Sequence, residues 1–326
     1  MQKRFILSLL IASICFSCQK AGQQSIAQVN PVFVPAFNAD SAYQYIADQL
    51  AFGPRVPNTI AHEQCGFYLA EQLKRFGADV TEQETTLFLL DKSPISIKNI
   101  IGSFMPEEKH RILLFAHWDT RPYADWDPNP DNWRTPIDGA NDGAGSCAVL
   151  LEIARQIGMN APKLGIDIIF FDAEDWGPPR FSDETKHYGS WCMGSEYWSK
   201  HPHIPNYTAR YGILLDMVSA PNATFYKEYY SKQSAPMVLR KVWETAQRLG
   251  YGNYFIDQDM GGIEDDHIQV ILNRKIPCID IIQHDPSSDN GFGKYWHTLD
   301  DNLSNVSKET MQASGQTVLE VIYNEK

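Results

Sequence analysis

The sequence predicts an α/β fold with three layers (α/β/α), in which helices cover both faces of a central twisted, mostly parallel mixed sheet. Two observations indicate this class. Short, continuous apolar runs such as RILLFA, IDIIFF and YGILL have the length and composition of strands that are buried on both faces. Segments with helical periodicity separate these runs, and this alternation is typical of parallel strands joined by helical crossovers.

The first 18 residues have the pattern of an export signal. A basic pair precedes an apolar run over residues 5–16, which is too short to span a bilayer. The run ends in Ser17-Cys18, which resembles the lipobox of bacterial lipoproteins, where the cysteine becomes the acylated first residue. We therefore expect residues 1–17 to be a signal peptide and Cys18 to carry a lipid anchor, in an exported lipoprotein of a bacterial cell envelope that faces the periplasm. An ordinary signal peptide, with Cys18 discarded, is the alternative.

The rest of the chain divides into a polar tether over residues 18–39 and a single catalytic domain over residues 40–326. No internal repeat or low-complexity linker interrupts this domain. Asp40-Ser41 has the composition of a helix N-cap, and Gly77 is suited to end the second helix. In chain order we predict helices over 42–52 and 62–77, strands over 79–90, 96–104 and 110–117, a helix over 143–158, a strand over 166–175, a helix over 194–201, a strand over 211–217, a helix over 236–250, a strand over 277–282 and a helix over 308–323.

Charge and cysteine content exclude several classes of function. The net charge is −12, and loss of the two basic residues of the signal peptide makes it −14, which argues against a nucleic-acid partner or an anionic-membrane surface. We therefore expect membrane contact only through the lipid anchor. The four cysteines that remain after processing are widely spaced and form no C-x-x-C pair, so neither a cysteine zinc site nor a thioredoxin-type redox centre is encoded. Spacing leaves the disulfide pairing open for the cysteines of the mature chain, Cys65, Cys147, Cys192 and Cys278.

Three of the predicted strands end in groups that bind metals or transfer protons. His117 and Asp119 follow the first of these strands, Glu174 and Asp175 the second, and Asp216 the third. In open α/β sheets, ligands bind beyond the carboxyl ends of the strands, so these side chains should meet at one edge. A lone Asp at a strand end is more often a turn or cap residue, but the joint placement of all five favours a site.

Two further segments supply candidate ligands. Asp142 lies in GANDGAG, where the flanking glycines let the backbone approach an ion, although Asp142 could instead only cap the following helix. His297 lies in YWHTLDD. Carboxylates and imidazoles in this number suit zinc, which binds nitrogen and oxygen ligands and keeps one position open in a catalytic site. Of the adjacent Glu174 and Asp175, one can bind the metal while the other acts as general base or acid.

The motifs of this set also carry a family resemblance. The series AHWD, GANDGAGSC, FFDAED, LLDMVSAPN, IEDDHI and WHTLDDN, in this order and at these separations, resembles the zinc-dependent glutaminyl-peptide cyclotransferases of animal type and their bacterial relatives. The resemblance extends from about residue 40 to the C-terminus. These enzymes belong to a wider group of zinc aminopeptidase-like (M28-type) proteins, and IEDDHI together with a Trp directly before the last His favours the cyclases within that group.

The resemblance implies a role for each candidate. Asp142, Asp175 and His297 would bind one zinc ion per chain, and Glu174 would be the general base and acid. His117 matches a ligand of the second metal in two-zinc aminopeptidases but lies beside the metal in cyclases, so binding of a second metal stays open. Asp216 and Asp265 would form a hydrogen-bonded acidic relay with Glu174. Asp119 would orient His117, and Trp296 would help to hold the substrate amide.

Three departures from the animal pattern point to the bacterial branch. Asp175 replaces the more usual Glu, so the strand end or the metal must shift toward the shorter side chain. Ala116 stands where animal members have a Cys that bridges to the counterpart of Cys147, so that disulfide cannot form. The segment over residues 176–191 is longer and Pro-rich, which leaves the wall of the substrate pocket open.

The expected reaction is conversion of N-terminal glutamine on peptides and proteins to pyroglutamate, with release of ammonia. Zinc would polarise the γ-carbonyl of the substrate, Glu174 would move the proton, and the pocket would fold the substrate onto itself. Candidates to line the pocket beside Trp296 are Trp176, Trp191 and Phe292, although such aromatic residues can instead pack in the core. The alternative function is a two-metal zinc aminopeptidase, because all five ligands of a two-zinc site are present: His117, Asp142, Asp175, Asp216 and His297.

The loop DWDPNPDNWRTP has acidic residues at alternate positions, as a calcium loop does. Pro130 occupies the position that needs Gly, and the Glu at the twelfth position is missing, so calcium binding is disfavoured. We expect this loop to form a lid or rim that contributes Trp126 and Trp133.

The remaining histidines have less informative surroundings. His62 and five others lack ligand spacing and are predicted to lie on the surface or in loops. His267 in IEDDHI is the exception, and we expect it to orient Asp265 or Asp266. A third, non-enzymatic interpretation is a surface lipoprotein that binds glycan or peptide, and it predicts no activity that depends on metal.

Overall fold

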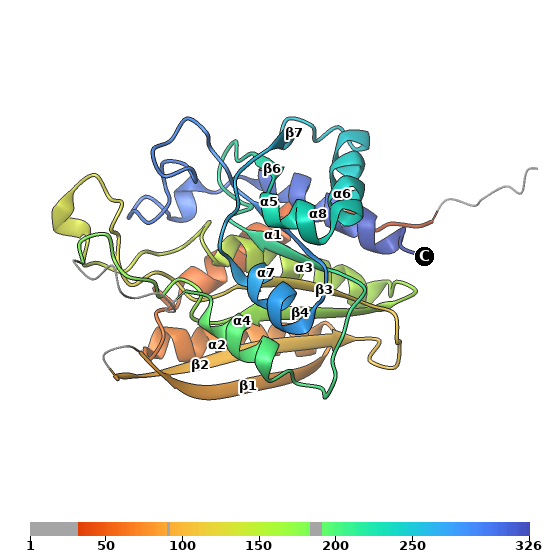
Figure 1. The fold of residues 1–326 in the computed structure, drawn as a ribbon, viewed down its shortest axis with the longest axis horizontal. Coiled ribbons are helices and arrows are strands. Elements are labelled where there is room, and N and C mark those ends of the chain that lie inside the picture. The colour runs from red at the N-terminus through yellow and green to blue at the C-terminus, as the bar shows by residue number, and fades with distance from the viewer. Residues whose placement is uncertain (1–31, 90–91, 183–190) are drawn as a thin grey trace, which may run out of the picture. The chain divides into compact units, whose positions relative to one another are not determined.

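The computed structural model describes residues 32–89, 92–182 and 191–326. Phe33–Lys326 form one unit, in which a sheet lies between layers of helices (Figure 1). The predicted signal peptide, Cys18 and most of the predicted tether lie outside the described residues. Within the described ranges, no helix has both the length and the apolar character needed to cross a bilayer.

The central sheet has six strands in the order β1-β2-β4-β3-β5-β8. β1 and β2 pair with their neighbours in antiparallel fashion, whereas β4, β3, β5 and β8 run parallel to one another. The predicted mixed, mostly parallel sheet is therefore confirmed. The strands are β1 Asp79–Phe88, β2 Pro94–Phe104, β3 Arg111–His117, β4 Gly165–Phe171, β5 Gly212–Asp216 and β8 Cys278–Ile282.

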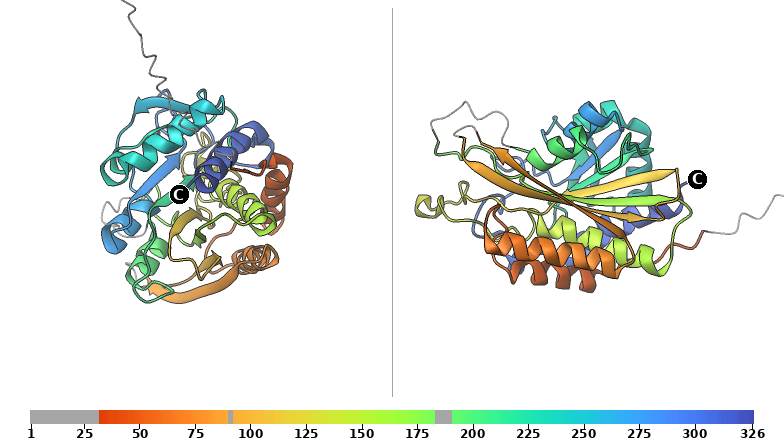
Figure 2. Two further views of the ribbon diagram at one scale, coloured as in Figure 1. Left: turned by 90° about the vertical axis from the view of Figure 1, so that its right-hand side faces the viewer. Right: turned by 90° about the horizontal axis from the view of Figure 1, so that it is seen from below.

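Helices form the two outer layers of the fold (Figure 2). The N-cap of the first helix is Asn38, whose side chain accepts a hydrogen bond from the backbone N–H of Ser41, and not the predicted Asp40-Ser41. Phe37 is already buried in the core, so the fold begins before the predicted tether boundary. The predicted helices are α1 Ala39–Leu50, α2 Ile60–Arg75, α3 Ala144–Met159, α4 Met193–Lys200, α6 Pro236–Arg248 and α8 Lys308–Tyr323.

The short elements escaped the sequence analysis because each is too brief to show a periodic pattern. Two of them, β6 and β7, form a separate two-stranded sheet. The helix α7 matters most for the site, because Asp265 caps it and His267 lies within it. These elements are β6 Phe225–Lys227, α5 Tyr229–Ser234, β7 Phe255–Asp259, α7 Asp266–Gln269, the π-helical segment Val270–Arg274, and the 3-10 turns Pro130–Asn132 and Leu303–Asn305.

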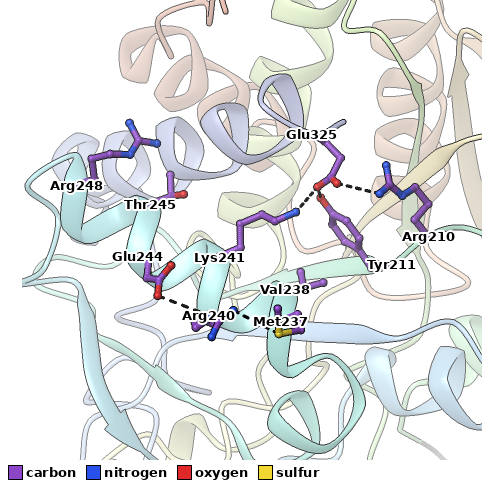
Figure 3. Close-up of a pocket in the computed structure, with 10 residues that line it drawn as sticks. All are labelled: Arg210, Tyr211, Met237, Val238, Arg240, Lys241, Glu244, Thr245, Arg248 and Glu325. Atoms are coloured by element: carbon purple, nitrogen blue, oxygen red, sulfur yellow. Dashed lines mark hydrogen bonds and ion pairs between the residues drawn. The ribbon is translucent and has the colours of Figure 1, made fainter. Parts of the chain in front are cut away.

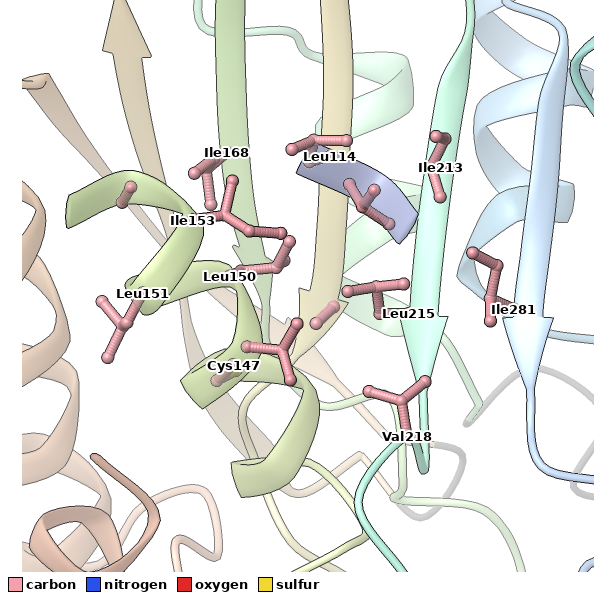
Figure 4. Close-up of a cluster of buried hydrophobic side chains, with 14 of the residues drawn as sticks. Leu114, Cys147, Leu150, Leu151, Ile153, Ile168, Ile213, Leu215, Val218 and Ile281 are labelled. Carbon is pink, nitrogen blue, oxygen red and sulfur yellow. The ribbon is translucent and has the colours of Figure 1, made fainter. Parts of the chain in front are cut away.

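Burial explains why the apolar runs form the centre of the sheet. Every residue of β3, β4, β5 and β8 is buried, so both faces of these strands pack against other elements. One face packs against α1, α2, α3, α6 and α8, and the opposite face packs against α4 and the π-helical segment. Figure 4 shows part of the packing between the sheet and the helices that cover the first of these faces. There, Leu114 and Ile168 of the sheet lie beside Leu150 and Ile153 of α3. This packing fixes the strand ends that carry the candidate site.

Candidate active site and metal centre

The carboxyl ends of β3, β4 and β5 open onto a pocket. His117 at the end of β3 pairs in register with Phe171 at the end of β4, and β5 ends at Asp216. Because these strands are parallel, the segments that follow them converge at this edge. The residues that line the pocket are Asp142, Glu174, Asp175, Trp191, Asp216, Met217, Gly262, Ile263, Glu264, Asp265, Ile282, Phe292, Trp296 and His297.

Asp142, Asp175 and His297 come together in this pocket as one trio. His297 Nε2 lies 3.1 Å from Asp175 Oδ1 and 3.5 Å from Asp142 Oδ2. One ligand atom from each residue lies within 4.8 Å of the others, and all three residues are buried. The three residues predicted to bind zinc therefore have the spacing of a metal site.

His117, Asp142 and Asp216 form a second trio that shares Asp142 with the first. His117 Nε2 lies 3.1 Å from Asp142 Oδ1 and 3.3 Å from Asp216 Oδ1. Asp142 thus presents one carboxylate oxygen to each imidazole. This arrangement brings together all five groups of the predicted two-metal alternative.

The backbone around Asp142 is held by a residue that the sequence analysis missed. Asp301 accepts the backbone N–H groups of Asn141 and Asp142, at 2.7 and 3.0 Å. Burial, followed by the nearby charge of Asp142, raises the pKa of Asp301 to about 7. Gly143 has φ +96°, and a Cβ there would lie 2.7 Å from the Asp119 carbonyl oxygen. Only glycine therefore allows this close approach beside the site.

Asp119 fixes the orientation of the two acidic residues after β4. Its Oδ1 accepts the backbone N–H of Glu174 at 3.0 Å, and its Oδ2 accepts that of Asp175 at 3.2 Å. Asp119 Oδ1 also lies 3.5 Å from His117 Nδ1, which is consistent with the predicted orienting contact. Asp119 thus connects the end of β3 with the turn that presents Glu174 and Asp175.

His297 has a carboxylate partner in the loop that resembles a calcium loop. Asp125 Oδ1 lies 3.5 Å from His297 Nδ1, and the same carboxylate accepts hydrogen bonds from Arg121 at 2.7 and 2.8 Å. Burial opposes ionisation of Asp125, but Arg121 and His297 hold its pKa well below its ordinary value. The ring of Trp126 packs against that of Trp296, with centroids 5.3 Å apart, as expected for a rim. The sequence did single out Asp125, through its alternation with Asp127. That pattern indicated a calcium loop, however, and not a carboxylate that contacts a metal-binding histidine.

Glu174, Asp216 and Asp265 line the same pocket and share a high local density of negative charge. Burial raises the pKa of Glu174 well above its ordinary value, and the nearby carboxylates of Asp265 and Asp175 raise it further against the effect of His117. Burial and the charge of Asp216 raise the pKa of Asp265 to about 7. Among the described residues, no hydrogen bond joins Glu174 to Asp216 or Asp265, although ligand atoms of Glu174 and Asp265 lie within 4.8 Å.

Three of the four predicted aromatic residues line the pocket. Trp296 stacks on the imidazole of His297 with centroids 3.7 Å apart, and Phe292 packs against Trp296 at 4.9 Å. Trp191 lies nearly parallel to His297 at 6.4 Å. The prediction for Trp176 is wrong: it packs outside the pocket against a small cluster that contains Ile95, Ile97, Ala173 and Met193. Asp175 thus faces the pocket, whereas the next side chain along the chain packs against this cluster.

The prediction that His62 lies on the surface or in a loop is also wrong. His62 is buried in α2, its Nε2 lies 2.9 Å from Asp172 Oδ1, and its ring stacks on Trp118 with centroids 4.2 Å apart. Asp172 also accepts the backbone N–H of Ala173 at 2.8 Å. His62 therefore supports the turn before Glu174, a contact that no local sequence pattern indicates.

Among the described residues, no hydrogen bond or ion pair joins His267 to Asp265 or Asp266, although ligand atoms of His267 and Asp265 lie within 4.8 Å. His267 Nε2 lies 3.4 Å from Glu228 Oε2 and its Nδ1 lies 3.9 Å from Asp280 Oδ2.

The four cysteines of the described chain are buried free thiols, and Cys147 donates a hydrogen bond to the carbonyl oxygen of His117 at 3.1 Å. Cys192 donates to Glu174 Oε1 at 3.4 Å, a contact that the sequence analysis did not anticipate.

Buried side-chain atoms without a hydrogen-bond partner lie at the two trios and, in a second group, at Asp265, Asp266, His267 and Asp280. Among the described residues they include both carboxylate oxygens of Asp175, Asp142 Oδ2 and Asp216 Oδ1. Buried polar atoms are normally paired, so these oxygens fit a bound cation. Carboxylate and imidazole donors, with a pocket that gives access, are the donor set of a catalytic zinc site.

Known proteins resemble this chain along most of its length. The family profile described as Peptidase family M28 matches residues 99–322. The glutaminyl-peptide cyclotransferase of Bos taurus is 29% identical over 288 residues, which cover 79% of this chain and 74% of that protein. The crystal structure of Tannerella forsythia glutaminyl cyclase is 56% identical with a TM-score of 0.88, and covers 90% of this chain and 100% of that chain. The chain belongs to the glutaminyl cyclase branch of peptidase family M28.

A further solved structure of similar fold is named after a different reaction. A Zn-dependent exopeptidase from Parabacteroides distasonis ATCC 8503 is 60% identical with a TM-score of 0.88, and covers 90% of this chain and 100% of that chain. Two solved structures that resemble this chain about equally well are thus named after different reactions, one after peptide cleavage and the other after glutamine cyclisation. The residues of the pocket, and not the fold, must therefore support the choice between them.

Proposed function

We propose that the protein is a glutaminyl-peptide cyclotransferase, which converts the N-terminal glutamine of peptides and proteins to pyroglutamate and releases ammonia. The observation that carries this proposal is the geometry of one pocket, where the trio of Asp142, Asp175 and His297 shares a cavity with the half-buried carboxylate of Glu174. Similarity to the bovine and Tannerella enzymes supports the same function.

The proposed cofactor is one zinc ion per chain, held by Asp142, Asp175 and His297. These residues offer oxygen and nitrogen donors, and both oxygens of Asp175 lack another partner in the described part of the chain. When bound, zinc supplies a Lewis acid for a carbonyl oxygen. Asp125 and Arg121 keep the imidazole of His297 in place for this role.

Glu174 moves the proton of the reaction. The α-amine nitrogen of the substrate attacks its own γ-amide carbon, so a ring C–N bond forms and the bond to the amide nitrogen breaks. The proton lost by the amine passes to the Glu174 carboxylate and then to the leaving nitrogen, which departs as ammonia. Burial raises the pKa of Glu174, which suits a group that must both accept and return a proton. Asp216 and Asp265 line the same cavity, and the Asp265 carboxylate contributes to the raised pKa of Glu174.

The aromatic wall holds the substrate in a folded conformation. Trp296 and Phe292 pack together on one side of the cavity, and Trp191 lies over His297. Flat apolar walls bury the methylene groups of glutamine and exclude water, which favours ring closure over hydrolysis. The rate gain of such a pocket comes from proximity of two groups within one substrate molecule.

A two-metal aminopeptidase is the second candidate, because His117, Asp142 and Asp216 form a further trio. In this trio His117 Nε2 and Asp142 Oδ1 form a hydrogen bond at 3.1 Å, whereas the 3.1 Å contact of His297 with Asp175 leaves both Asp175 oxygens without a hydrogen-bond partner among the described residues. The trio with Asp175 offers more unpartnered oxygen atoms, which favours a single metal there. Metal content distinguishes the two functions, since a cyclase requires one zinc ion per chain and this peptidase requires two.

We also propose that the protein is an exported lipoprotein, anchored through Cys18 to a bacterial cell envelope and facing the periplasm. The support is the basic pair, the short apolar run and the Ser17-Cys18 pair of the sequence. Fractionation of cells that express the wild type or Cys18→Ala tests this. We expect wild-type protein in the membrane fraction and less of the variant there; equal membrane association of both would contradict lipidation at Cys18.

The test of the function uses two matched peptides that differ only in their first residue, Gln or Leu. Purified zinc-loaded protein is incubated with each, and the products are followed by mass spectrometry. We expect the Gln peptide to lose one ammonia without shortening, and the Leu peptide to stay intact. A chelator should stop the reaction and added zinc should restore it. Shortening of either peptide would support the aminopeptidase instead.

A further inference from the structure

Cys192 places a buried thiol against the proposed general base. Its Sγ donates a hydrogen bond to Glu174 Oε1 at 3.4 Å, and Cys192 is only 3% exposed. Ligand atoms of Glu174, Cys192 and Asp265 lie within 4.8 Å of one another. Among the described residues, no other hydrogen-bond donor reaches the side chain of Glu174. Within the described part of the chain, the Cys192 thiol is therefore the one donor that orients this carboxylate.

The backbone holds the two side chains in this relation. The backbone N–H of Cys192 donates to the carbonyl oxygen of Glu174, and that of Met193 donates to Ala173, both at 3.0 Å. Asp175 and Trp191 form an antiparallel bridge next to these contacts. The segment that begins at Trp191 thus runs against the turn that presents Glu174, and these backbone contacts hold the backbone of Cys192 beside Glu174.

Cys192 also has a backbone conformation that disfavours its side chain. It adopts φ 55° and ψ 33°, in the left-handed region that glycine enters without strain. Retention of a side chain at such a position suggests that the side chain has a function. Burial and the nearby charge of Glu174 raise the pKa of the Cys192 thiol well above its ordinary value, so the group remains a neutral S–H donor at neutral pH.

We infer that Cys192 is a positioning residue, whose thiol orients the Glu174 carboxylate for proton transfer in the cyclisation reaction. The inference rests on the proposed function, because that function makes Glu174 the base. A thiol is a weak donor and fixes the carboxylate without holding it as strongly as an arginine or lysine would. Glu174 can therefore take up and release the proton while its direction stays fixed.

The test measures kcat and KM for a Gln-initiated peptide, zinc content and Tm for a set of variants. Cys192→Ala removes the donor, Cys192→Ser restores a donor of similar size, and Cys192→Gly removes the donor while relieving the backbone. Cys278→Ala is the matched control, since the thiol of Cys278 is also buried and also donates a 3.4 Å hydrogen bond, but to the carbonyl oxygen of Ile276 at the amino end of β8.

We expect kcat to fall about tenfold in Cys192→Ala and Cys192→Gly, a part of the roughly 10²–10⁴-fold that a general base contributes, with KM and zinc content unchanged. Cys192→Ser should recover most of the loss. Cys278→Ala should lower Tm and leave kcat unchanged. A positioning role predicts a lower kcat while KM and zinc content stay at wild-type values. A merely structural role predicts a lower Tm instead.

Two outcomes would overturn the inference. Wild-type kcat in Cys192→Ala or Cys192→Gly would show that the thiol has no role, and Cys192→Ser no better than Cys192→Ala would show that the hydrogen bond is not the cause. Failure of the proposed function gives a different pattern, since the wild-type protein itself would then produce no pyroglutamate. If the wild type cyclises, Glu174→Gln is inactive and Cys192→Ala is normal, only the inference about Cys192 is wrong.

Discussion

Two buried clusters of charged side chains lie toward opposite ends of β3 and β4, and they differ in how their polar atoms are paired. Toward the amino ends, the Asp167 carboxylate accepts hydrogen bonds from Ser103, Arg111 and Tyr207, each at 2.7 Å. Arg111 also donates to the backbone carbonyl groups of Met105 and neighbouring residues. Both oxygens of the carboxylate and all three nitrogens of the guanidinium are paired within the protein.

At the carboxyl ends, the pocket carries equally buried groups that the protein leaves incomplete. Asp175 is only 1% exposed, yet neither of its oxygens has a hydrogen-bond partner among the described residues. Asp142 and Asp216 each have one such oxygen. A buried polar group without a partner is costly, so a fold that retains several of them in one place is built to receive a ligand.

The comparison separates a charged cluster that stabilises the fold from one that serves a reaction. Removal of a partner from the paired cluster should lower stability and leave catalysis alone. Removal of a group from the unpaired cluster should lower catalysis or metal binding and change stability little. Each of the following variants tests one side of this difference.

Glu174→Gln should have the largest effect. We expect kcat to fall about a thousandfold, equivalent to about 4 kcal/mol in the activation barrier, because the amide cannot accept the proton. Zinc content, measured by elemental analysis, and Tm should stay at wild-type values. Turnover near that of the wild type would remove Glu174 from its proposed role.

Asp167→Asn tests the paired cluster. We expect the free energy of unfolding, measured by denaturant titration, to fall by about 3 kcal/mol, because the Arg111 guanidinium is left buried with an uncompensated charge. The kcat of the folded enzyme should not change. A loss of kcat at full zinc content would contradict the separation of the two clusters.

Asp125→Asn tests how far the site extends beyond the residues that face the pocket. The amide keeps the shape of the side chain but loses the charge that faces His297 Nδ1. We expect zinc affinity, measured by competition with a chelator, to fall about tenfold, in the range typical of groups that orient metal ligands. Unchanged affinity would show that Arg121 and the backbone suffice to hold the imidazole.

Glu325→Gln should have the smallest effect of these variants, a small change in Tm. Glu325 is a paired carboxylate that lies away from the candidate site, in a surface groove (Figure 3). Glu325 accepts a 2.7 Å hydrogen bond from Tyr211 and pairs with Arg210 and Lys241. Burial opposes ionisation, but these partners hold the pKa of Glu325 below its ordinary value of 4.5. A carboxylate with a lowered pKa in the folded state stabilises the protein above pH 4.5 and loses that contribution as pH falls through its folded pKa.

The Tm of the wild type should therefore fall more steeply below pH 4.5 than the Tm of Glu325→Gln. Above that pH, the variant should be slightly less stable than the wild type. Parallel Tm curves for the two proteins across this range would show that Glu325 has no pH-dependent contribution.

The sequence was sufficient to predict the layers of the fold and the edge where the site lies. Continuous apolar runs identify the central strands, and acidic residues or His at the ends of those runs identify the pocket, because parallel strands end on one side. Helix boundaries were predicted within a few residues, since amphipathic periodicity is strong over three or four turns. Short elements such as α5 and α7 lack this signal.

Sequence patterns could not predict contacts between distant loops. Asp125 meets His297, and Asp301 meets Asp142, across separations of more than 150 residues, and only the folded backbone brings them together. Trp176 illustrates the opposite error, because a neighbour of Asp175 in sequence lies outside the pocket. The left-handed backbone of Cys192, which brings its thiol to Glu174, has no signature in the residue type.

Anomalous X-ray diffraction at the zinc edge, from crystals of the zinc-loaded protein, would show directly how many metal ions the pocket binds and where. We expect one strong peak per chain, within bonding distance of Asp142, Asp175 and His297, beside Glu174. Two peaks of equal strength, with the second bound by His117, Asp142 and Asp216, or no peak between Asp142 and Asp175, would contradict this expectation.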